Sequence, residues 1–582
     1  MEEKKVLLSV KDLEVKFNVR GRVLTAIRGI SLDILEDESI AIVGESGSGK
    51  SVFTKTFAGM LDSNGFISNG DVIFNDAELI DTVVPMNAAA WKTVASIEAQ
   101  LNHAASVENG AAIYNAMEAL KAEHDARGTL SPEEAKRIED EISELVFQRT
   151  EAFNLKQTLD PHNEKDEIKR IAAQISSFDA QIKKMQADKA AAVAQRKRAA
   201  AADTAYQQEY TARMAELKRD YAEACAQPVS EDVRARNAVL AKEVYLSVGR
   251  YGTVKRNKCI KLLLKAIKDA MVKGKDLNSD EVRNSVFDAV TFRVKYLDQT
   301  DSRLHGTCVL NLAKINDAND WTKIRGKKIA TVFQDPMTSL NPIITIGKQI
   351  TSIIMKHQQC TEVEARSRAL ELMYKVGIPN AEKRFDDYPF QYSGGMRQRI
   401  VIAIALSCQP KILICDEPTT ALDVTIQAQI LKLLKDLQKE FSYTIVFITH
   451  DLGVVANVAD RVAVMYAGQI VELGKVEEVF FDPRHPYTWA LLSSLPQLAQ
   501  KNTVLYSISG TPPSLYNKIV GDPFAPRNPY CLKIDTLLDS PMFQVTDTHF
   551  AKTWLLDPRA PKVEKPEIIH NIHEKLIQAF NI

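Results

Sequence analysis

A glycine-rich segment at residues 44–51, GESGSGKS, constrains this chain of 582 residues more than any other feature. It follows a short apolar run, SIAIVG, and precedes an apolar stretch that begins at Lys50. This order predicts a buried strand, a tight loop and a helix, the setting in which such a loop cradles phosphate groups. Glycines let backbone N–H groups converge on a phosphate where side chains would clash. The segment therefore predicts a nucleoside triphosphate site.

Composition is that of a soluble globular protein. Apolar residues make up 45% of the chain, charged residues 26%, and the formal net charge is −1. This balance argues against binding of nucleic acid by bulk charge. No run of eighteen or more apolar residues is present, and the start of the chain does not resemble a secretory signal. Seven cysteines without a CxxC pair favour a reduced cytosolic setting.

The pattern of residues divides the chain into four pieces. Residues 1–81 hold strand-like runs and the glycine-rich loop. Residues 319–480 return to buried strands between helical runs, which is typical of a mostly parallel sheet covered by helices. Residues 82–318, between them, are rich in Ala, Lys and Glu. Residues 481–582 are Pro-rich and irregular, which predicts an appended C-terminal extension.

Residues 82–318 are predicted to form an α-helical, coiled-coil-like insertion. The run Ser-Pro-Glu-Glu at 131–134 predicts a capped helix start, and Asp-Pro-His-Asn at 160–163 should break a helix. Apolar residues at alternating steps of three and four favour an antiparallel hairpin or small bundle. One such stripe consists of Ile168, Ile171, Ile175, Phe178, Ile182 and Met185. A lysine-rich helix at 255–271 is interpreted as solvated with one core face, rather than as a surface for nucleic acid or lipid.

The run KILICDEP predicts a buried strand that ends in two carboxylates. Asp416 at its tip can hold magnesium through water, and Glu417 can take a proton from an attacking water. Such a proton transfer is typically worth about 10²–10⁴-fold in rate. In the glycine-rich loop, Lys50 should reach the β- and γ-phosphates, and Ser51 should place its hydroxyl on Mg²⁺. These residues together predict hydrolysis of a nucleoside triphosphate.

Five motifs in a fixed order carry a family resemblance. They are GESGSGKS at 44–51, FQDPMTSLNP with Gln334, YSGGMRQR at 392–399, CDEPTTALDVT at 415–425 and FITHDLGVV with His450. This order resembles the nucleotide-binding subunit of an ABC transporter. FQDPMTSLNP and the tail segments HPYTWALLSSLP, GTPP and GDPFAPRNPY are similar to the oligopeptide/dipeptide importer branch. The resemblance covers residues 1–81 and 319–582 and leaves the insertion outside it.

The resemblance implies an α/β fold: a P-loop NTPase nucleotide-binding domain with an antiparallel β subdomain and a helical subdomain. It implies ATP and Mg²⁺ as ligands. Phe17 would stack on adenine, with an ordinary strand aromatic as the alternative. The implied nucleotide contacts are Phe17, Gly44, Glu45, Ser46, Gly47, Ser48, Gly49, Lys50, Ser51, Val52, Gln334, Ser393, Gly394, Gly395, Met396, Asp416, Glu417, Asp423 and His450. The implied catalytic residues are Glu417, His450 and Gln334. The residues implied to contact the metal are Ser51, Gln334 and Asp416.

The same resemblance implies an assembly. The phosphate loop and the helix that opens at residues 393–395 face different nucleotides in that family, so a complete site needs two subunits head to tail. The implied partners are a second homologous ATP-binding subunit, forming a heterodimer, two transmembrane permease subunits and, indirectly, an extracytoplasmic peptide-binding protein. No nucleic acid is expected. The chain is expected at the cytoplasmic face of the cell membrane, as the peripheral ATPase that energises uptake of oligopeptides or dipeptides.

Other interpretations stand beside the importer. A non-transport ABC ATPase of the chromosome-maintenance or DNA-repair type also carries a coiled-coil insertion, although there the arm usually follows the Gln loop and is much longer. The insertion as a docking module for another protein is compatible with transport. Some relatives carry cysteines proposed as iron–sulfur ligands where this chain has Asp522, Asn528 and Asp535. A cluster would need several thiolates, so none is predicted.

Overall fold

Apolar runs rich in Ile and Val form five adjacent parallel strands, which end at the edge strand β8 of an eight-stranded sheet with the strand order β13-β14-β12-β11-β3-β10-β9-β8. β3 and β10 are buried at every position, as expected for parallel strands covered on both faces. β12, β14 and β13 extend the sheet as antiparallel strands. The strands are β3 (Ser39–Val43), β8 (Ile329–Val332), β9 (Ile412–Asp416), β10 (Thr444–Thr449), β11 (Arg461–Tyr466), β12 (Gln469–Lys475), β13 (Phe543–Gln544) and β14 (Phe550–Ala551).

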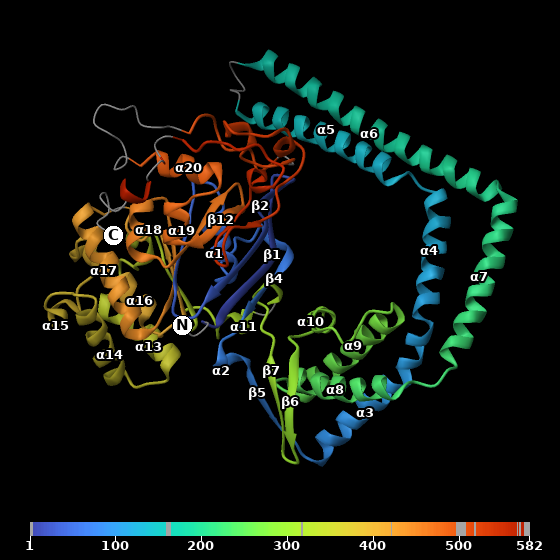
Figure 1. Cartoon of the computed structure of the whole chain (residues 1–582), viewed down its shortest axis with the longest axis horizontal. Coiled ribbons are helices and arrows are strands. Elements are labelled where there is room, and N and C mark those ends of the chain that lie inside the picture. The colour runs from blue at the N-terminus through green and yellow to red at the C-terminus, as the bar shows by residue number, and fades with distance from the viewer. Residues whose placement is uncertain are drawn as a thin grey trace. The chain divides into compact units, whose positions relative to one another are not determined.

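The chain splits into two compact units, both drawn in Figure 1. The first unit comprises Met1–Ile80 and Val309–Ile582, and the second unit comprises Asp81–Cys308. The computed structural model describes residues 4–158, 164–315, 318–420, 422–495, 508–516, 519–566, 569 and 572–575. Among the helices of these residues, none is both long enough and apolar enough to cross a bilayer.

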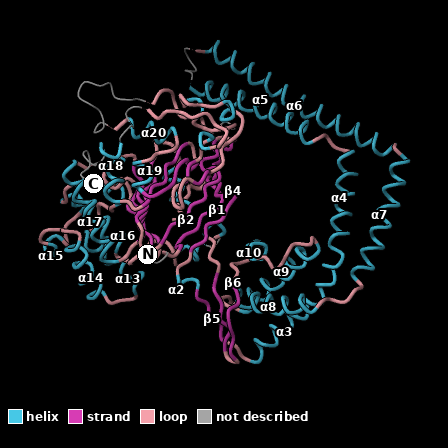
Figure 2. Tube along the Cα trace, viewed as in Figure 1, coloured by secondary structure: helices cyan, strands magenta, loops and turns pink. Residues whose placement is uncertain are grey.

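A three-stranded antiparallel sheet completes the β structure of the first unit, with the order β2-β1-β4. β1 (Val6–Val19) and β2 (Arg22–Leu35) form a hairpin whose two turn residues, Arg20 and Gly21, have φ of 49° and 80°. Two positive φ values in a two-residue turn match the twist of the flanking strands. β4 (Gly65–Phe74) pairs with the other edge of β1. The strands are magenta in Figure 2.

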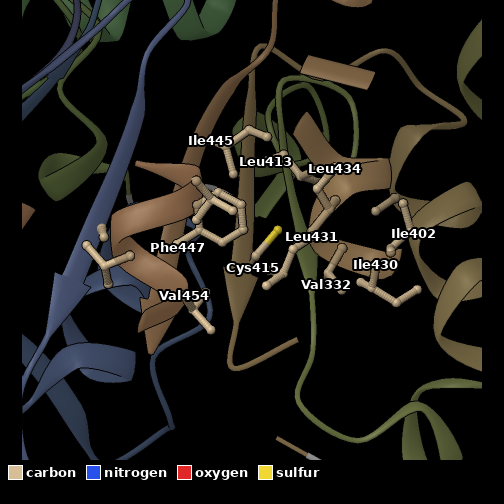
Figure 3. Close-up of a cluster of buried hydrophobic side chains, with 14 of the residues drawn as sticks. Val332, Ile402, Leu413, Cys415, Ile430, Leu431, Leu434, Ile445, Phe447 and Val454 are labelled. Atoms are coloured by element: carbon tan, nitrogen blue, oxygen red, sulfur yellow. The ribbon is translucent and has the colours of Figure 1, made fainter. Parts of the chain in front are cut away.

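Helices accompany these two sheets in the first unit, and the apolar side chains of the longer helices enter its buried core. They are α1 (Lys50–Phe57), α2 (Ala77–Ile80), α11 (Ala318–Trp321), α12 (Pro336–Ser339), α13 (Ile346–Gln358), α14 (Glu362–Lys375), α15 (Ala381–Arg384), α16 (Gly394–Leu406), α17 (Val424–Phe441), α18 (Leu452–Val458), α19 (Val476–Phe481) and α20 (Pro486–Ser493). Figure 3 shows side chains of β8, β9 and β10 packed with those of α16, α17 and α18 in one buried cluster. Each fully buried Leu, Ile, Val or Phe in such a cluster contributes about 1.5–3 kcal/mol relative to exposure.

The second unit begins and ends in paired strands. β5 (Asp81–Pro85), β7 (Arg303–Cys308) and β6 (Val294–Thr300) form an antiparallel sheet in the order β5-β7-β6. Asp81 pairs with Thr307, so the two ends of the unit lie on adjacent strands. The helices between them are α3 (Ala88–Ala104), α4 (Ala111–Arg127), α5 (Pro132–Thr158), α6 (Lys165–Ala202), α7 (Thr204–Cys225), α8 (Glu231–Val248), α9 (Thr253–Val272) and α10 (Asp280–Asp288).

Helices α5 and α6 run side by side as an antiparallel hairpin (Figure 1). The predicted helix start is confirmed, because Glu134 N–H donates to Ser131 Oγ while the Glu134 carboxylate accepts the Ser131 N–H. The six stripe residues of α6 are buried or half-buried, as the periodicity predicts. Ion pairs such as Lys189–Glu139 at 2.8 Å join the two helices. The predicted break at 160–163 lies outside the described residues.

The second unit differs from the predicted insertion in two respects. It ends at Cys308 rather than at 318, because Asn311 is hydrogen-bonded into the first unit. The Asn311 amide accepts the Val72 N–H at 3.0 Å and donates to Asp71 at 2.8 Å. The unit also contains the sheet β5-β7-β6 besides its helices. Most of β6 is exposed, so its sequence lacks the apolar alternation by which a half-buried strand is recognised.

Candidate nucleotide-hydrolysing site

The glycine-rich loop connects β3 to α1, as the sequence predicts. Gly49 is the N-cap of α1 and has φ of 98°, a conformation that favours glycine. A Cβ at Gly49 would lie 2.9 Å from the Ala26 carbonyl oxygen, and one at Gly44 would lie 2.2 Å from the Met465 carbonyl oxygen. Only glycine therefore fits at these two positions, where the loop packs closely against neighbouring backbone before it enters the N-terminus of the helix.

Lys50 lies inside the loop. Its Nζ donates to the carbonyl oxygens of Gly44 at 2.8 Å and Glu45 at 3.0 Å. Burial lowers the pKa of Lys50, and the nearby Glu417 and Asp416 carboxylates oppose that shift. Of the described residues, none provides a hydrogen-bond partner for the buried hydroxyl of Ser48. An unpaired buried hydroxyl beside a lysine and a helix N-terminus suits an anionic ligand such as a phosphate.

Asp416 and Ser51 meet beside the loop. The Ser51 hydroxyl donates to Asp416 Oδ1 at 3.1 Å, joining the start of α1 to the end of β9. Burial raises the pKa of Asp416, the Ser51 hydrogen bond lowers it, and the neighbouring Glu417 charge raises it again. The Ser51 hydroxyl oxygen and the desolvated Asp416 carboxylate together provide the kind of oxygen ligands that suit a hard divalent cation.

Glu417 follows the end of β9 and holds φ of 46°, which is uncommon for a residue other than glycine. Its carboxylate accepts hydrogen bonds from Gln334 Nε2 and from Thr420 Oγ1, each at 3.0 Å. His450 Nδ1, one residue past β10, lies 3.2 Å from the other carboxylate oxygen. The structure thus brings together the three residues predicted to be catalytic, with the carboxylate at their centre. Thr420 was not among the predicted site residues, although it belongs to the motif CDEPTTALDVT.

The predicted signature residues lie apart from this cluster. Ser393 caps α16, its hydroxyl accepting the Met396 N–H at 3.4 Å. A Cβ at Gly395 would lie 2.7 Å from the Ile426 side chain of α17. Within the described ranges, no hydrogen bond or ion pair joins residues 393–396 to residues 44–51.

Three further residues predicted to contact the nucleotide lie on β1, on α1 and at the N-cap of α17. The Asp423 carboxylate caps α17 by accepting the Ile426 N–H at 2.9 Å. Phe17 is half-buried on β1, and a Cβ at Gly65 would lie 2.6 Å from its ring. The ring therefore covers a strand glycine. Val52 is half-buried on α1.

The C-terminal extension also contacts the phosphate loop, which the sequence analysis did not predict. The hydroxyl of Tyr487 accepts the backbone N–H of Glu45 at 2.9 Å. Arg527 donates two hydrogen bonds to the Glu45 carboxylate, at 2.8 and 3.0 Å. Both residues belong to motifs quoted for the family resemblance, HPYTWALLSSLP and GDPFAPRNPY. These motifs could have marked Tyr487 and Arg527 as functional residues. Their spacing in the sequence does not indicate that both residues contact Glu45.

Comparison with known protein families identifies two matching regions. The family described as "ABC transporter" matches residues 27–221 and 293–420, more than half of the chain. The family described as "Oligopeptide/dipeptide transporter, C-terminal region" matches residues 471–534. The second match covers the segment that supplies Tyr487 and Arg527.

Individual relatives agree with both matches. The chain is 66% identical over 266 residues to the oligopeptide transport ATP-binding protein AmiE of Streptococcus pneumoniae, which covers 46% of this chain and 75% of that protein. It is 60% identical over 262 residues to the oligopeptide transport ATP-binding protein OppD of Bacillus subtilis, covering 45% and 73%. It is 60% identical over 245 residues to the dipeptide transport ATP-binding protein DppD of Lactococcus lactis subsp. cremoris, covering 42% and 70%.

These similarities confirm the predicted resemblance and exclude the chromosome-maintenance and DNA-repair alternative. The phosphate loop, the paired carboxylates and the C-terminal motifs all lie in the first unit, on the fold that the ABC family uses to bind and hydrolyse ATP. The chain belongs to the ABC transporter ATPases, in the group of ATP-binding proteins that carry the oligopeptide/dipeptide transporter C-terminal region.

Proposed function

We propose that this chain is the ATP-hydrolysing subunit that energises uptake of oligopeptides or dipeptides through an ABC importer. The observation that carries the proposal is the convergence of Ser51, Asp416 and Glu417 beside the phosphate loop. It occurs in a chain whose relatives are peptide-transport ATP-binding proteins. Peptide selection would rest with the membrane subunits and the binding protein rather than with this site.

ATP would bind with its phosphates in the loop at residues 44–51. The N-terminus of α1 directs its positive dipole end and unpaired N–H groups at that position. Lys50 Nζ would exchange the carbonyl oxygens of Gly44 and Glu45 for phosphate oxygens, and the Ser48 hydroxyl would gain a partner. Phe17 would contact the adenine with the part of its ring that Gly65 leaves uncovered.

Hydrolysis would depend on the carboxylates at the end of β9. The oxygens of Ser51 and Asp416 would hold Mg²⁺, which supplies neutralisation of charge on the phosphates when bound. Glu417 would accept a proton from the attacking water. Gln334 and His450 would fix the orientation of that carboxylate, because each already contacts one of its oxygens. His450 would also contact the γ-phosphate.

A second homologous ATP-binding subunit would complete each site. Ser393 and Gly394 are exposed at the N-terminus of α16, where they can meet a nucleotide held by another subunit. Head-to-tail pairing would close on ATP and reopen after hydrolysis. We further propose a heterodimer, in which each site takes its phosphate loop from one chain and its signature helix from the other, with the two roles exchanged between the sites.

Two transmembrane permease subunits would receive the motion of that dimer. Three large apolar side chains near Gln334 and the signature are exposed: Met337 at 60%, Ile343 at 81% and Phe390 at 69%. Exposed apolar side chains in a functional region suit a protein interface. In that arrangement the chain lies on the cytoplasmic face of the membrane, and the extracytoplasmic peptide-binding protein is an indirect partner.

Purification of the tagged full chain from its own membranes tests this function. We expect two permease subunits and a second ATP-binding subunit in stoichiometric amounts. ATP hydrolysis by that complex should rise when the binding protein is added with an oligopeptide. Recovery of stoichiometric DNA without any membrane protein would overturn the proposal.

A further inference from the structure

Glu45, the second residue of the phosphate loop, is held at both its backbone and its side chain by the C-terminal extension. Its N–H donates to the Tyr487 hydroxyl at 2.9 Å. Its carboxylate accepts Arg527 Nη1 at 2.8 Å and Nη2 at 3.0 Å, one on each oxygen. A bidentate guanidinium–carboxylate pair fixes direction as well as distance. Two separate segments of the extension therefore meet on one loop residue.

The pair is shielded from solvent, chiefly on the arginine side. The Arg527 side chain is 5% exposed and that of Glu45 is 24% exposed. Arg527 also donates to the Tyr466 hydroxyl at 3.1 Å and, through Nε, to the Ser509 carbonyl oxygen at 3.0 Å. The hydrogen bonds to Glu45 raise the pKa of Arg527. Poor solvation strengthens such a pair and makes removal of one partner costly.

The helix that presents Tyr487 is anchored to the eight-stranded sheet. His485 caps α20, and its Nδ1 accepts the Tyr487 N–H at 3.0 Å. The buried carboxylate of Glu472 on β12 accepts the His485 N–H at 3.0 Å. The Tyr487 ring packs against Tyr466 and Phe524, with ring centroids 4.6 and 5.3 Å away. The hydroxyl is thus presented to the loop from a rigid site.

Glu45 is also one of the two residues whose carbonyl oxygen holds Lys50. Three groups of Glu45 are therefore engaged at once: the N–H with Tyr487, the carboxylate with Arg527 and the carbonyl with Lys50. A shift of Glu45 would move an acceptor of the lysine that is proposed to bind the phosphates. The extension is in this way connected to Lys50 through a single residue.

We propose that Arg527 and Tyr487 are positioning residues for the phosphate loop, and that the C-terminal extension thereby sets the affinity of the site for ATP. This inference rests on the proposed function, because it takes ATP as the ligand of the loop. Arg527 orients Glu45 and neutralises its carboxylate, which stands beside the place where negatively charged phosphates bind. Tyr487 fixes the backbone at the same residue.

Because Arg527 neutralises the Glu45 carboxylate, its removal should have an electrostatic effect on ATP binding that a loss of packing alone would not produce. The Arg527→Ala variant leaves the Glu45 carboxylate unpaired, where it repels phosphates. Adding Glu45→Gln removes that charge while it keeps the size of the side chain. The double variant should therefore bind ATP better than Arg527→Ala alone, although it has lost both members of the pair.

The test measures the Kd of a fluorescent ATP analogue for the full chain, and the KM for ATP and kcat of the assembled transporter. Arg527→Ala should raise Kd and KM about tenfold or more, with kcat changed less than about threefold. Arg527→Lys should be intermediate, because lysine keeps the charge but not the two-pronged geometry. Tyr487→Phe keeps the ring and should raise KM about threefold. The double variant Arg527→Ala/Glu45→Gln should return Kd to within about threefold of Glu45→Gln alone.

Controls separate this role from folding and from the proposed function. Arg559→Ala removes an 85% exposed guanidinium of the same extension, paired with Asp557, and should leave Kd and KM unchanged. Thermal unfolding reports whether each variant folds; if Arg527→Ala does not, Arg527→Lys and Tyr487→Phe carry the test. Unchanged Kd and KM in the folded variants, or a double variant as weak as Arg527→Ala, overturns the inference. Wild-type ATP binding and hydrolysis in Lys50→Ala would instead overturn the proposed site itself.

Discussion

The Ser51 hydroxyl donates a hydrogen bond to the Asp416 carboxylate at 3.1 Å, although 365 positions separate the two residues in the sequence. Much of that separation is the second unit, Asp81–Cys308. The unit leaves the site intact because the strands that lead into and out of it pair side by side, with Asp81 opposite Thr307. When the two ends of an insertion are adjacent, the host domain can accommodate it without separating the elements on either side of the insertion point.

Replacing Glu417 by Gln should preserve ATP binding and abolish turnover. The amide keeps the size of the side chain and can still accept the Gln334 hydrogen bond, but it cannot take a proton from water. We expect phosphate release by the assembled transporter to fall by about 10²–10⁴-fold while the Kd for ATP changes little. Glu477→Gln, on the exposed side of α19, is the matched control. Normal turnover in Glu417→Gln would assign the base to another residue.

Deleting residues 81–308 and joining Ile80 to Val309 through a short Gly/Ser linker should leave a folded, ATP-binding protein. The two cut ends border the paired residues Asp81 and Thr307, so a short linker can span them. The second unit buries its own apolar cluster, which includes Leu240 and Leu263, and so does not supply the core of the first unit. Fluorescent ATP binding and a single thermal transition are the measurements. Loss of both would make the second unit part of the ATPase core.

A deletion with the bounds expected from the sequence, 82–318, should be clearly less stable. It removes Asn311, whose amide bonds to the backbone of Val72 and to Asp71, and the buried Leu312. Loss of Asn311 would leave the buried Val72 N–H without its acceptor, which typically costs about 1–3 kcal/mol. Comparing the thermal midpoints of the two deletions checks this. Equal midpoints would show that residues 309–318 are dispensable to the first unit.

The sequence predicted the first unit well where local pattern and tertiary structure agree. Buried apolar runs became β3, β8, β9 and β10, because a strand covered on both faces needs a continuous apolar run. The motifs located the loop, the carboxylates, Gln334 and His450, since each sits at the end of one of these strands. Motif order also identified the family, which no single motif could have done.

Contacts between distant segments were beyond prediction. The pairing of Arg527 with Glu45 joins residues 482 positions apart, and one sequence carries no record of which charges meet. The sheet β5-β7-β6 was missed because exposed strands lose the period-two pattern. The boundary near 308 was missed because Asn311 has no local partner to mark it, and its role depends on Val72 across the fold.

Within the second unit, Arg293→Leu should be strongly destabilising. Arg293 and Glu243 are both almost fully buried, and the guanidinium donates to the two carboxylate oxygens at 3.0 and 2.7 Å. Removing Arg293 leaves the buried Glu243 carboxylate with only its longer contact to Arg283, at 3.4 Å, and loss of a buried partner typically costs about 3–5 kcal/mol. Hydrogen exchange of the α8 amides in the full chain measures the loss. The double variant Glu243→Leu/Arg293→Leu should recover part of it, and Arg213→Leu, on the exposed face of α7, should not change exchange.

Stability should depend on pH through Asp522 in the C-terminal extension. Burial raises its pKa from 3.8 to about 6, with the Asp535 and Asp539 charges adding to the shift and the Phe524 N–H, which donates to the carboxylate at 2.9 Å, opposing it. Because the folded-state pKa is the higher one, the contribution of Asp522 to stability is fully present below pH 3.8. It is lost as pH rises through about 6.

The Asp522→Asn variant should therefore be more stable than the natural chain above pH 6. The amide oxygen can still accept the Phe524 N–H, while the cost of burying a charge disappears. The shift corresponds to a gain on the order of 3 kcal/mol at pH 8 that shrinks towards zero near pH 4. Urea unfolding of both proteins at pH 5 and pH 8 measures it, with the exposed Asp547→Asn as control. A variant that is no more stable than the natural chain at pH 8 would mean that burial of the charged Asp522 carboxylate does not destabilise the folded chain.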